Sequence, residues 1–164
     1  MNKKEFVNSK ILNAGKLKQQ LTLWRFMDKK IVFTNGVFDL LHLGHIDYLS
    51  KAKDLGSVLI IGVNTDESAK RLGKGNNRPI TDEVSRSTII AALGFVDAVV
   101  LFSEDTPHEL IKTIQPDILV KGADYKPEEI VGYDVVTAKG GKIETIEFLP
   151  GYSTTNIEKK IKDS

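Results

Sequence analysis

The chain has 164 residues, 41% hydrophobic and 27% charged, which is the balance of one globular domain with a buried core rather than of a fibre or a disordered tail. Its 23 Lys and Arg against 22 Asp and Glu leave a net charge of +1, which argues against a nucleic-acid partner bound by neutralising many phosphates. With no cysteine, a polar N-terminus and no apolar run that could span a membrane, we expect a cytoplasmic protein without disulfides and without a membrane partner.

Apolar residues near the N-terminus recur at roughly helical spacing and predict one amphipathic helix over residues 8–26. Its apolar side chains are Ile11, Leu12, Leu17, Leu21 and Trp24. A helix of this kind packs on its own domain, on a partner or on a second domain. We therefore divide the chain into an N-terminal helical extension, residues 1–28, and a main domain, residues 29–164.

From Lys30 onward, short apolar runs bounded by Gly, Pro, Asp or Asn alternate with helical stretches. The runs predict strands at residues 31–33, 58–63, 99–101, 118–120 and 142–149. Strands that alternate with helices are typical of an α/β fold, here a Rossmann-like, doubly wound parallel sheet with helices on both faces.

Two of the later helices carry start signals. Thr106 is predicted to cap one helix, with Pro107 at the first helical position and Glu109 completing a capping box. His108 lies inside this box without a partner in the sequence, so we interpret it as a surface helix residue. The last helix is predicted to begin near Ser153.

The segment with the densest chemical pattern is TNGVFDLLHLGH, residues 34–45, which we call the signature segment. It follows the first predicted strand of the main domain, where α/β sheets bind ligands, and its glycines let the backbone approach a ligand closely. Amides at the start of the next helix favour a phosphate there. His42 and His45, three residues apart on the first helical turn, can both donate hydrogen bonds to phosphoryl oxygens. Alone, such a pair is equally compatible with structural histidines or part of a metal site.

The signature segment closely resembles the HxGH motif of the nucleotidylyltransferase superfamily, whose fold is the Rossmann-like HUP type. The resemblance continues through SVLIIGVNTDESAKRLGKGNNRPI, LFSEDTPHELIKTIQPDILVKGADYKPEEI and GYSTTNIEKKI, so that it covers nearly all of residues 30–162. These segments are similar to the heptose 1-phosphate adenylyltransferases within the superfamily. The resemblance implies transfer of AMP from ATP to D-glycero-β-D-manno-heptose 1-phosphate, with release of pyrophosphate, to supply ADP-heptose for lipopolysaccharide or another surface glycan.

By this resemblance, His42 and His45 contact the nucleotide phosphates and stabilise the α-phosphorus during in-line attack, without a covalent enzyme intermediate. The neighbouring residues expected to bind the nucleotide are Thr34, Asn35, Gly36, Val37, Phe38 and Gly44. A second superfamily motif, for the β- and γ-phosphates, corresponds to Ser153, Thr154 and Thr155 before the last helix, where an ordinary helix cap is the alternative.

Further residues are expected around the same cleft. Lys74, as a catalytic residue, and Arg86 are the cations expected at the triphosphate, because a nucleotide brings several negative charges together; solvated surface charge is the alternative for Lys74. Another strand end at the same sheet edge is expected to border the base, although the atom that reads the base stays open. Its residues are Lys121, Gly122, Asp124 and Tyr125.

The acceptor substrate is expected near Asp39, Asn64 and Asp66. Asp39 can also orient a loop or meet magnesium through water. The sequence shows no dedicated cage of carboxylates, so we expect no metal site of the protein itself and Mg²⁺ carried with the nucleotide.

The nearest alternative is a cytidylyltransferase that makes CDP-glycerol or a related CDP-alcohol. Those enzymes usually have a last motif that resembles RTEGISTT, whereas this chain has LPGYSTT, and its KGADYKPEEI segment favours ATP and heptose. Tyr152 also departs from the small residue or cysteine common at that point in the heptose group. The retained histidines argue against a non-catalytic nucleotide-binding regulator, and 164 nearly neutral residues lack the tRNA-binding region of a class I aminoacyl-tRNA synthetase.

The partners expected are therefore ATP and a sugar 1-phosphate. Dimers are usual in the family, so a homodimer stays open by analogy. No sugar-kinase domain fits before residue 30, and we expect a stand-alone enzyme that works beside a separate heptose kinase.

Overall fold

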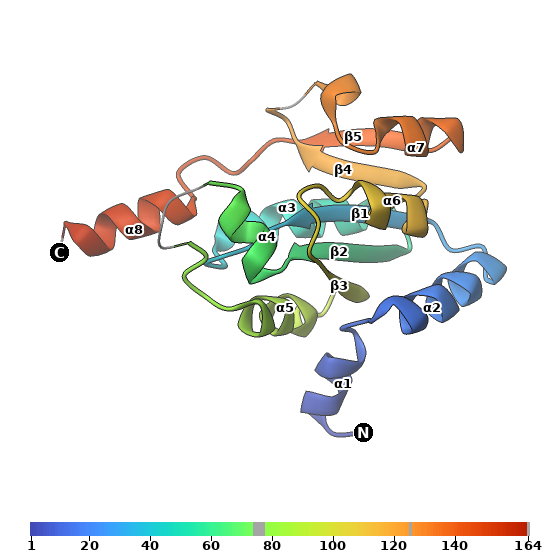
Figure 1. The fold of residues 1–164 in the computed structure, drawn as a ribbon, viewed down its shortest axis with the longest axis horizontal. Coiled ribbons are helices and arrows are strands. Elements are labelled where there is room, and N and C mark those ends of the chain that lie inside the picture. The colour runs from blue at the N-terminus through green and yellow to red at the C-terminus, as the bar shows by residue number, and fades with distance from the viewer. Residues whose placement is uncertain (74–77, 125, 164) are drawn as a thin grey trace.

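The computed structural model describes residues 1–73, 78–124 and 126–163 and has one five-stranded sheet at its centre (Figure 1). All pairs of neighbouring strands are parallel, and the spatial order is β3-β2-β1-β4-β5. The strands are β1 (Ile31–Gly36), β2 (Val58–Asn64), β3 (Ala98–Phe102), β4 (Ile118–Gly122) and β5 (Lys142–Ile146). This is the doubly wound, Rossmann-like arrangement that the alternating pattern predicts, and the last strand ends three residues before its predicted limit.

Helices connect these strands and flank them at both ends of the chain. They are α1 (Lys3–Ser9), α2 (Ala14–Phe26), α3 (Leu43–Asp54), α4 (Asp66–Arg71), α5 (Glu83–Ala92), α6 (His108–Ile114), a 3-10 turn η1 (Pro127–Glu129), α7 (Tyr133–Ala138) and α8 (Thr154–Lys162). Within the part of the chain that the structure describes, no helix is both long enough and apolar enough to cross a bilayer.

The alternation of side chains along the strands places one hydrophobic core on each face of the sheet. On one face, Val32, Leu59 and Ile61 pack with α3 and α5, whose buried residues include Leu49 and Ile90. On the other face, strand residues pack with α2, α6 and α7 through Leu17, Leu21, Ile111, Ile114 and Val136. Both faces are thus covered, which explains why β2 and β3 are nearly continuous apolar runs and why β1 and β4 begin with one, whereas β5 at the sheet edge is only partly buried.

Strands β1 and β4 pair over only part of their length. Their register contains Val32 opposite Ile118 and Phe33 opposite Leu119, whereas β1 stays paired with β2 as far as Gly36. The connections run in opposite directions from this point, because β2 and β3 lie on one side of β1 while β4 and β5 lie on the other. The carboxyl ends of β1 and β4 therefore separate into a crevice at the topological switch point, where open α/β sheets bind ligands.

The N-terminal segment forms two helices, so the single helix predicted over residues 8–26 is wrong. Between them the backbone is extended and pairs with the outer edge of β3: Leu12 N donates to Val99 O at 2.8 Å, and Val99 N donates to Lys10 O at 2.9 Å. Asn13 then caps α2 by accepting a hydrogen bond from Lys16 N at 2.9 Å. This pairing gives hydrogen-bond partners to the backbone N–H and C=O groups of Val99 on the outer edge of β3. An uninterrupted helix could not supply those partners.

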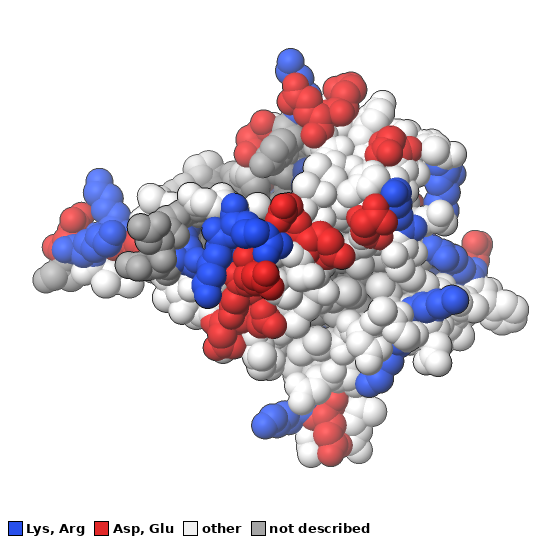
Figure 2. All heavy atoms as spheres, viewed as in Figure 1, with Lys and Arg blue, Asp and Glu red and all other residues white. Residues whose placement is uncertain are grey.

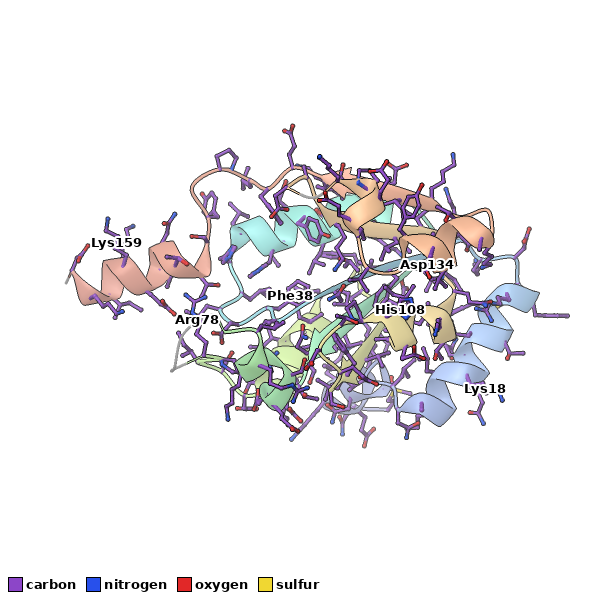
Figure 3. The ribbon with its side chains drawn as sticks, turned by 45° about the horizontal axis from the view of Figure 1, so that its top comes forward. Lys18, Phe38, Arg78, His108, Asp134 and Lys159 are labelled. Carbon is purple, nitrogen blue, oxygen red and sulfur yellow. The ribbon has the colours of Figure 1, made fainter. Side chains whose placement is uncertain are left out.

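The capping box predicted before α6 is also wrong. The helix begins at His108 with Pro107 at the cap position and has no side-chain hydrogen bond at its start. The Glu109 carboxylate instead accepts from Lys112 Nζ at 2.9 Å on its own helix. His108 lies beside Asp134 of α7 (Figure 3). The His108 Nε2 and Asp134 Oδ2 atoms are 3.5 Å apart.

Truncating Leu21 tests whether α2 is part of the folded domain, because its side chain is 3% exposed within the core. We expect Leu21→Ala to lower the free energy of unfolding by about 2 to 5 kcal/mol, the usual cost of a buried Leu→Ala change. The matched control is Leu23→Ala on the same helix, where the side chain is 49% exposed and a change below about 0.5 kcal/mol is expected. Equal effects in urea unfolding would contradict this packing.

Candidate functional site

A cavity of about 610 Å³ opens at the carboxyl ends of the strands, which is within the range of small-molecule sites. It includes the crevice between β1 and β4. Of the residues predicted to form the site, those that line it are Asn35, Gly36, Val37, Phe38, Asp39, His45, Asn64, Lys121, Gly122, Asp124 and Thr154. Lys74 and Tyr125 lie outside the described residues. The site predicted from several distant segments is therefore largely brought together by the fold.

His42 and His45 meet at the start of α3. His42 occupies the cap position and His45 the first turn, and their rings stack with centroids 3.8 Å apart. A Cβ atom at Gly44 would lie 3.0 Å from His42 Nδ1 and 3.1 Å from Tyr152 Cβ, so a side chain there would push the histidine rings or the chain before α8 aside. Gly44 thus serves the packing of the histidine pair.

The environment of His45 keeps its ring neutral near pH 7. Burial, and next the charge of His42, lower the pKa of His45 to about 4, and burial lowers the pKa of His42. The Nδ1 atoms of both rings are buried and have no hydrogen-bond partner among the described atoms. An N–H without an acceptor is costly, so the proton belongs on Nε2. Neutral His45 then presents one N–H donor.

The loop after β1 is fixed by a carboxylate. Asp39 is 8% exposed, and its Oδ1 accepts hydrogen bonds from Ile80 N at 2.8 Å and Thr81 N at 2.9 Å. The ring of Phe38, whose φ is 52°, packs edge-on against His45 with centroids 5.4 Å apart. Of the roles predicted for Asp39, orienting a loop matches this geometry, and Phe38 supports the histidine pair.

Arg86 requires a correction, because its side chain does not face the cavity where the triphosphate was expected. It is 1% exposed and donates to three backbone carbonyl oxygens: Thr81 at 2.9 Å, Val37 at 2.7 Å and Asn64 at 2.8 Å. Its Nη2 also pairs with Asp66 Oδ1 at 2.6 Å. The guanidinium therefore ties the ends of β1 and β2 to the start of α5.

Asp66 is corrected by the same contact, since its carboxylate is directed at Arg86 and it does not line the cavity. Asn64 does line the cavity, while its amide nitrogen donates to Ser68 Oγ at 2.9 Å. Thr34 also differs from its predicted role at the nucleotide, because it is fully buried and its hydroxyl lies 2.9 Å from the Tyr48 hydroxyl. Of these three residues, only Asn64 is placed to meet a substrate.

Lys121 bridges the crevice between the separated strands. Its Nζ donates to Asn35 Oδ1, which joins the end of β4 to the end of β1. Burial lowers the pKa of Lys121 to about 8, although the nearby Asp124 carboxylate acts in the opposite direction. The ammonium is thus a cation with little hydration at the cavity wall, where an anionic ligand would stabilise its charge.

The N-terminus of α8 forms the remaining wall. Ser153 caps the helix by accepting from Asn156 N at 3.0 Å, and Thr154 lines the cavity. The prediction of a helix start near Ser153 is confirmed. Thr155 is exposed on the first turn.

Several lining residues were not predicted. They come from α3, from the segments after α4, before α5 and before α6, and from η1: Tyr48, Leu72, Arg78, Asp105, Thr106 and Glu129. Arg78 is four residues after Lys74 in the sequence, so the reasoning from charge that selected Lys74 as a phosphate-binding candidate could also have selected Arg78. The others carry no spacing pattern that distinguishes them from ordinary loop residues.

The described residues offer no group of three or more His, Asp or Glu side chains that could hold a metal ion. Asp39, the one carboxylate considered for magnesium, is already hydrogen-bonded to backbone amides. These residues do not fit a metal cage supplied by the protein. A divalent ion would instead need phosphate oxygens as its main ligands.

The chain is similar in sequence to one part of longer proteins. The profile described as cytidylyltransferase-like matches residues 33–160. The bifunctional protein HldE of Citrifermentans bemidjiense is 52% identical over 157 residues, which are 96% of this chain and 32% of that protein. HldE of Campylobacter jejuni subsp. jejuni is 57% identical over 143 residues, 87% of this chain and 30% of that protein. The chain thus spans less than two thirds of either relative.

Two solved structures share the fold. A lipopolysaccharide core biosynthesis protein from Thermoplasma volcanium is 32% identical, with a TM-score of 0.59, and the match covers 74% of this chain and 97% of that chain. A pantoate-beta-alanine ligase from Francisella tularensis is 18% identical, with a TM-score of 0.58 over 93% of this chain and 76% of that chain. At that identity the ligase supports the fold alone.

The ionisation of His45 can be measured directly. In nuclear magnetic resonance titrations of the ring protons, we expect His45 to remain neutral down to about pH 5 and to protonate near pH 4. A midpoint near the ordinary value of about 6.5 would show that its ring is solvated and would contradict the buried stack.

Proposed function

The chain belongs to the cytidylyltransferase-like family, and we propose that it transfers AMP from ATP to D-glycero-β-D-manno-heptose 1-phosphate, giving ADP-heptose and pyrophosphate. The product would serve lipopolysaccharide or another surface glycan. The observation that carries this proposal is the stacked His42 and His45 pair at the start of α3, of which His45 lines the cavity at the switch point of the sheet. The high identity to HldE proteins favours the heptose substrate.

The proposed reaction is a single in-line displacement. A phosphate oxygen of the sugar 1-phosphate attacks the α-phosphorus of ATP, a new P–O bond forms, and the bond to the bridging oxygen breaks so that pyrophosphate leaves. Neutral His45 donates its Nε2–H to an α-phosphate oxygen, and the amides at the start of α3 face the same charge. No side chain needs to become covalently attached, because positioning and charge stabilisation supply the catalysis.

The remaining predicted site residues divide between the two substrates. We assign the β- and γ-phosphates to the N-terminus of α8, with Ser153, Thr154 and Thr155, and to Lys74. Gly122, Asp124 and Tyr125 are assigned to the nucleoside. A side chain at Gly122 would collide with the Phe148 ring, so the backbone there approaches its neighbours closely. Of the residues expected near the acceptor, Asn64 and Asp39 line the cavity, and we assign the acceptor to Asn64 at the end of β2 because the Asp39 carboxylate is already hydrogen-bonded to backbone amides.

Magnesium would enter with the triphosphate, whose charge it neutralises when bound, because the described residues provide no cage of their own. We also propose that the reaction occurs in the cytoplasm, that a separate kinase supplies the sugar phosphate, and that the chain can form a homodimer. Nucleic acid is not a proposed partner: on the face drawn in Figure 2, acidic and basic side chains of the described residues lie next to each other instead of forming one basic surface.

The experiment that tests the reaction combines the purified protein and Mg²⁺ with heptose 1-phosphate and either ATP or CTP, and follows pyrophosphate release with mass detection of the product. We expect ADP-heptose from ATP. A parallel arm supplies glycerol 3-phosphate with CTP. Formation of CDP-glycerol would overturn the substrate assignment. Binding of nucleotide without release of pyrophosphate in any arm would contradict the proposal that the protein is a nucleotidyltransferase.

His45→Ala should lower kcat by roughly 100- to 1000-fold, the usual cost of removing one well-placed donor to a developing charge. The matched control is His108→Ala, which removes the same ring from a position on α6 that does not line the cavity. Circular dichroism establishes that both variants are folded. A decrease below about tenfold in the folded His45 variant would remove this residue from the catalytic role.

A further inference from the structure

Helix α8 has an unusual position for an element that contributes to the cavity. It projects from the body of the protein beyond the carboxyl edge of the sheet, as Figure 1 shows, and none of its residues is buried. Only its N-terminal end, through Thr154, reaches the cavity. The direction of the helix therefore depends on contacts other than a hydrophobic core.

An ion pair links α8 to the segment before α5. Arg78 Nε donates to Glu158 Oε1 at 2.9 Å, and Arg78 Nη2 lies 2.8 Å from Glu158 Oε2. The side chains are 19% and 23% exposed, so the pair is largely shielded from water. Two parallel contacts between a guanidinium and a carboxylate fix relative orientation as well as distance. The neighbouring guanidinium also lowers the pKa of Glu158.

The chain on the other side of the pair leads to the signature segment. Arg78 itself lines the cavity, and two residues later Ile80 N and then Thr81 N donate to the Asp39 carboxylate. A short path of hydrogen bonds and ion pairs thus runs from α8, through residues 78–81, to the loop that carries Phe38. Figure 3 shows Arg78 between Phe38 and α8, whereas Lys159 lies on the helix itself.

We propose that Arg78 and Glu158 are positioning residues that orient α8, so that Ser153, Thr154 and the helix N-terminus face the outer phosphates of the nucleotide. This inference rests on the proposed function, which assigns that end of the cavity to the β- and γ-phosphates. The pair acts on binding and not on the reacting α-phosphorus, which lies at the histidines.

Direct binding of phosphate by Arg78 is the competing interpretation, since the side chain lines the cavity. The same Nε and Nη2 atoms are already engaged by Glu158, and a phosphate could recruit them only by breaking two charge-assisted contacts. The geometry therefore favours a role through α8.

The test measures affinity for α,β-methylene ATP by calorimetry, together with KM and kcat, in Glu158→Gln and Arg78→Gln. We expect each variant to weaken binding of the analogue and to raise the KM for ATP by about tenfold, the scale of one charge-assisted hydrogen bond, with kcat changed by less than about threefold. The double variant should be no worse than either single variant, because both remove the same interaction. Lys159→Gln, an exposed charge change on the same helix, is the matched control and should bind as the wild type does.

A charge-swapped variant, Arg78→Glu with Glu158→Arg, separates the two interpretations. If the pair orients α8, the reversed pair restores most of the affinity; if Arg78 binds phosphate, the swap fails and the inference is overturned. An unchanged affinity in Glu158→Gln would overturn it as well. The calorimetric measurement needs no acceptor, so a wild-type protein that binds the analogue but makes no ADP-heptose would refute the proposed reaction separately from the pair.

Discussion

Strands β1 and β4 separate before their carboxyl ends, and the walls of the cavity are built around the gap between them. In a doubly wound sheet, the connection that leaves β1 runs to one side and the connection that leaves β4 runs to the other side. Neither connection covers the space between the carboxyl ends of β1 and β4. Here the two strands stop pairing after Phe33 and Leu119, while β1 continues beside β2 to Gly36. The end of β4, the residues that follow β1 and the His45 side chain border the opening that results.

An opening of this kind needs polar groups that keep its walls in place, because the strand ends have lost ladder hydrogen bonds. The structure supplies them from three directions. Lys121 at the end of β4 donates to Asn35 across the crevice. Arg86 donates to the carbonyl oxygens of Val37 and Asn64, which lie at the ends of β1 and β2. Asp39 accepts a hydrogen bond from Ile80 N in the segment before α5. Charged side chains at this edge therefore perform two tasks. Some face the cavity, and others fix the backbone that surrounds it.

The sequence predicts the positions of the strands well, because a strand that is buried on both faces is a nearly continuous run of apolar residues such as Val, Ile and Leu. The positions of His42 and His45 at the start of α3 and of Ser153 at the start of α8 could also be predicted. Both follow from local sequence, because a three-residue spacing puts two side chains on one face of a helix and Ser is a common helix cap. Residues 8–26 were misread because Ile11 and Leu12 fit a helical period by coincidence, while the edge of β3, distant in sequence, binds that segment as an extended chain. Local propensity carries no information about such a partner.

Arg86 shows a second limit of the same reasoning. Composition indicates that cations gather near a phosphate site, but it does not distinguish a cation that faces the ligand from one buried beneath the backbone. Arg86 is the buried kind, and Arg78, which lines the cavity, has the same side chain eight positions earlier. Only the direction of each side chain separates their roles, and that direction follows from the packing of α5 and α8.

In the proposed complex the crevice between β1 and β4 holds the nucleotide, with the triphosphate running from α3 to α8. A crystal structure with α,β-methylene ATP and Mg²⁺ tests this placement, because the bond that would break cannot be cleaved in the analogue. We expect the α-phosphate beside His42 and His45, the outer phosphates at Ser153 and Thr154, and the base near the end of β4. A nucleotide bound with its phosphates elsewhere, for example among the basic residues around Arg25 and Lys139, would contradict it.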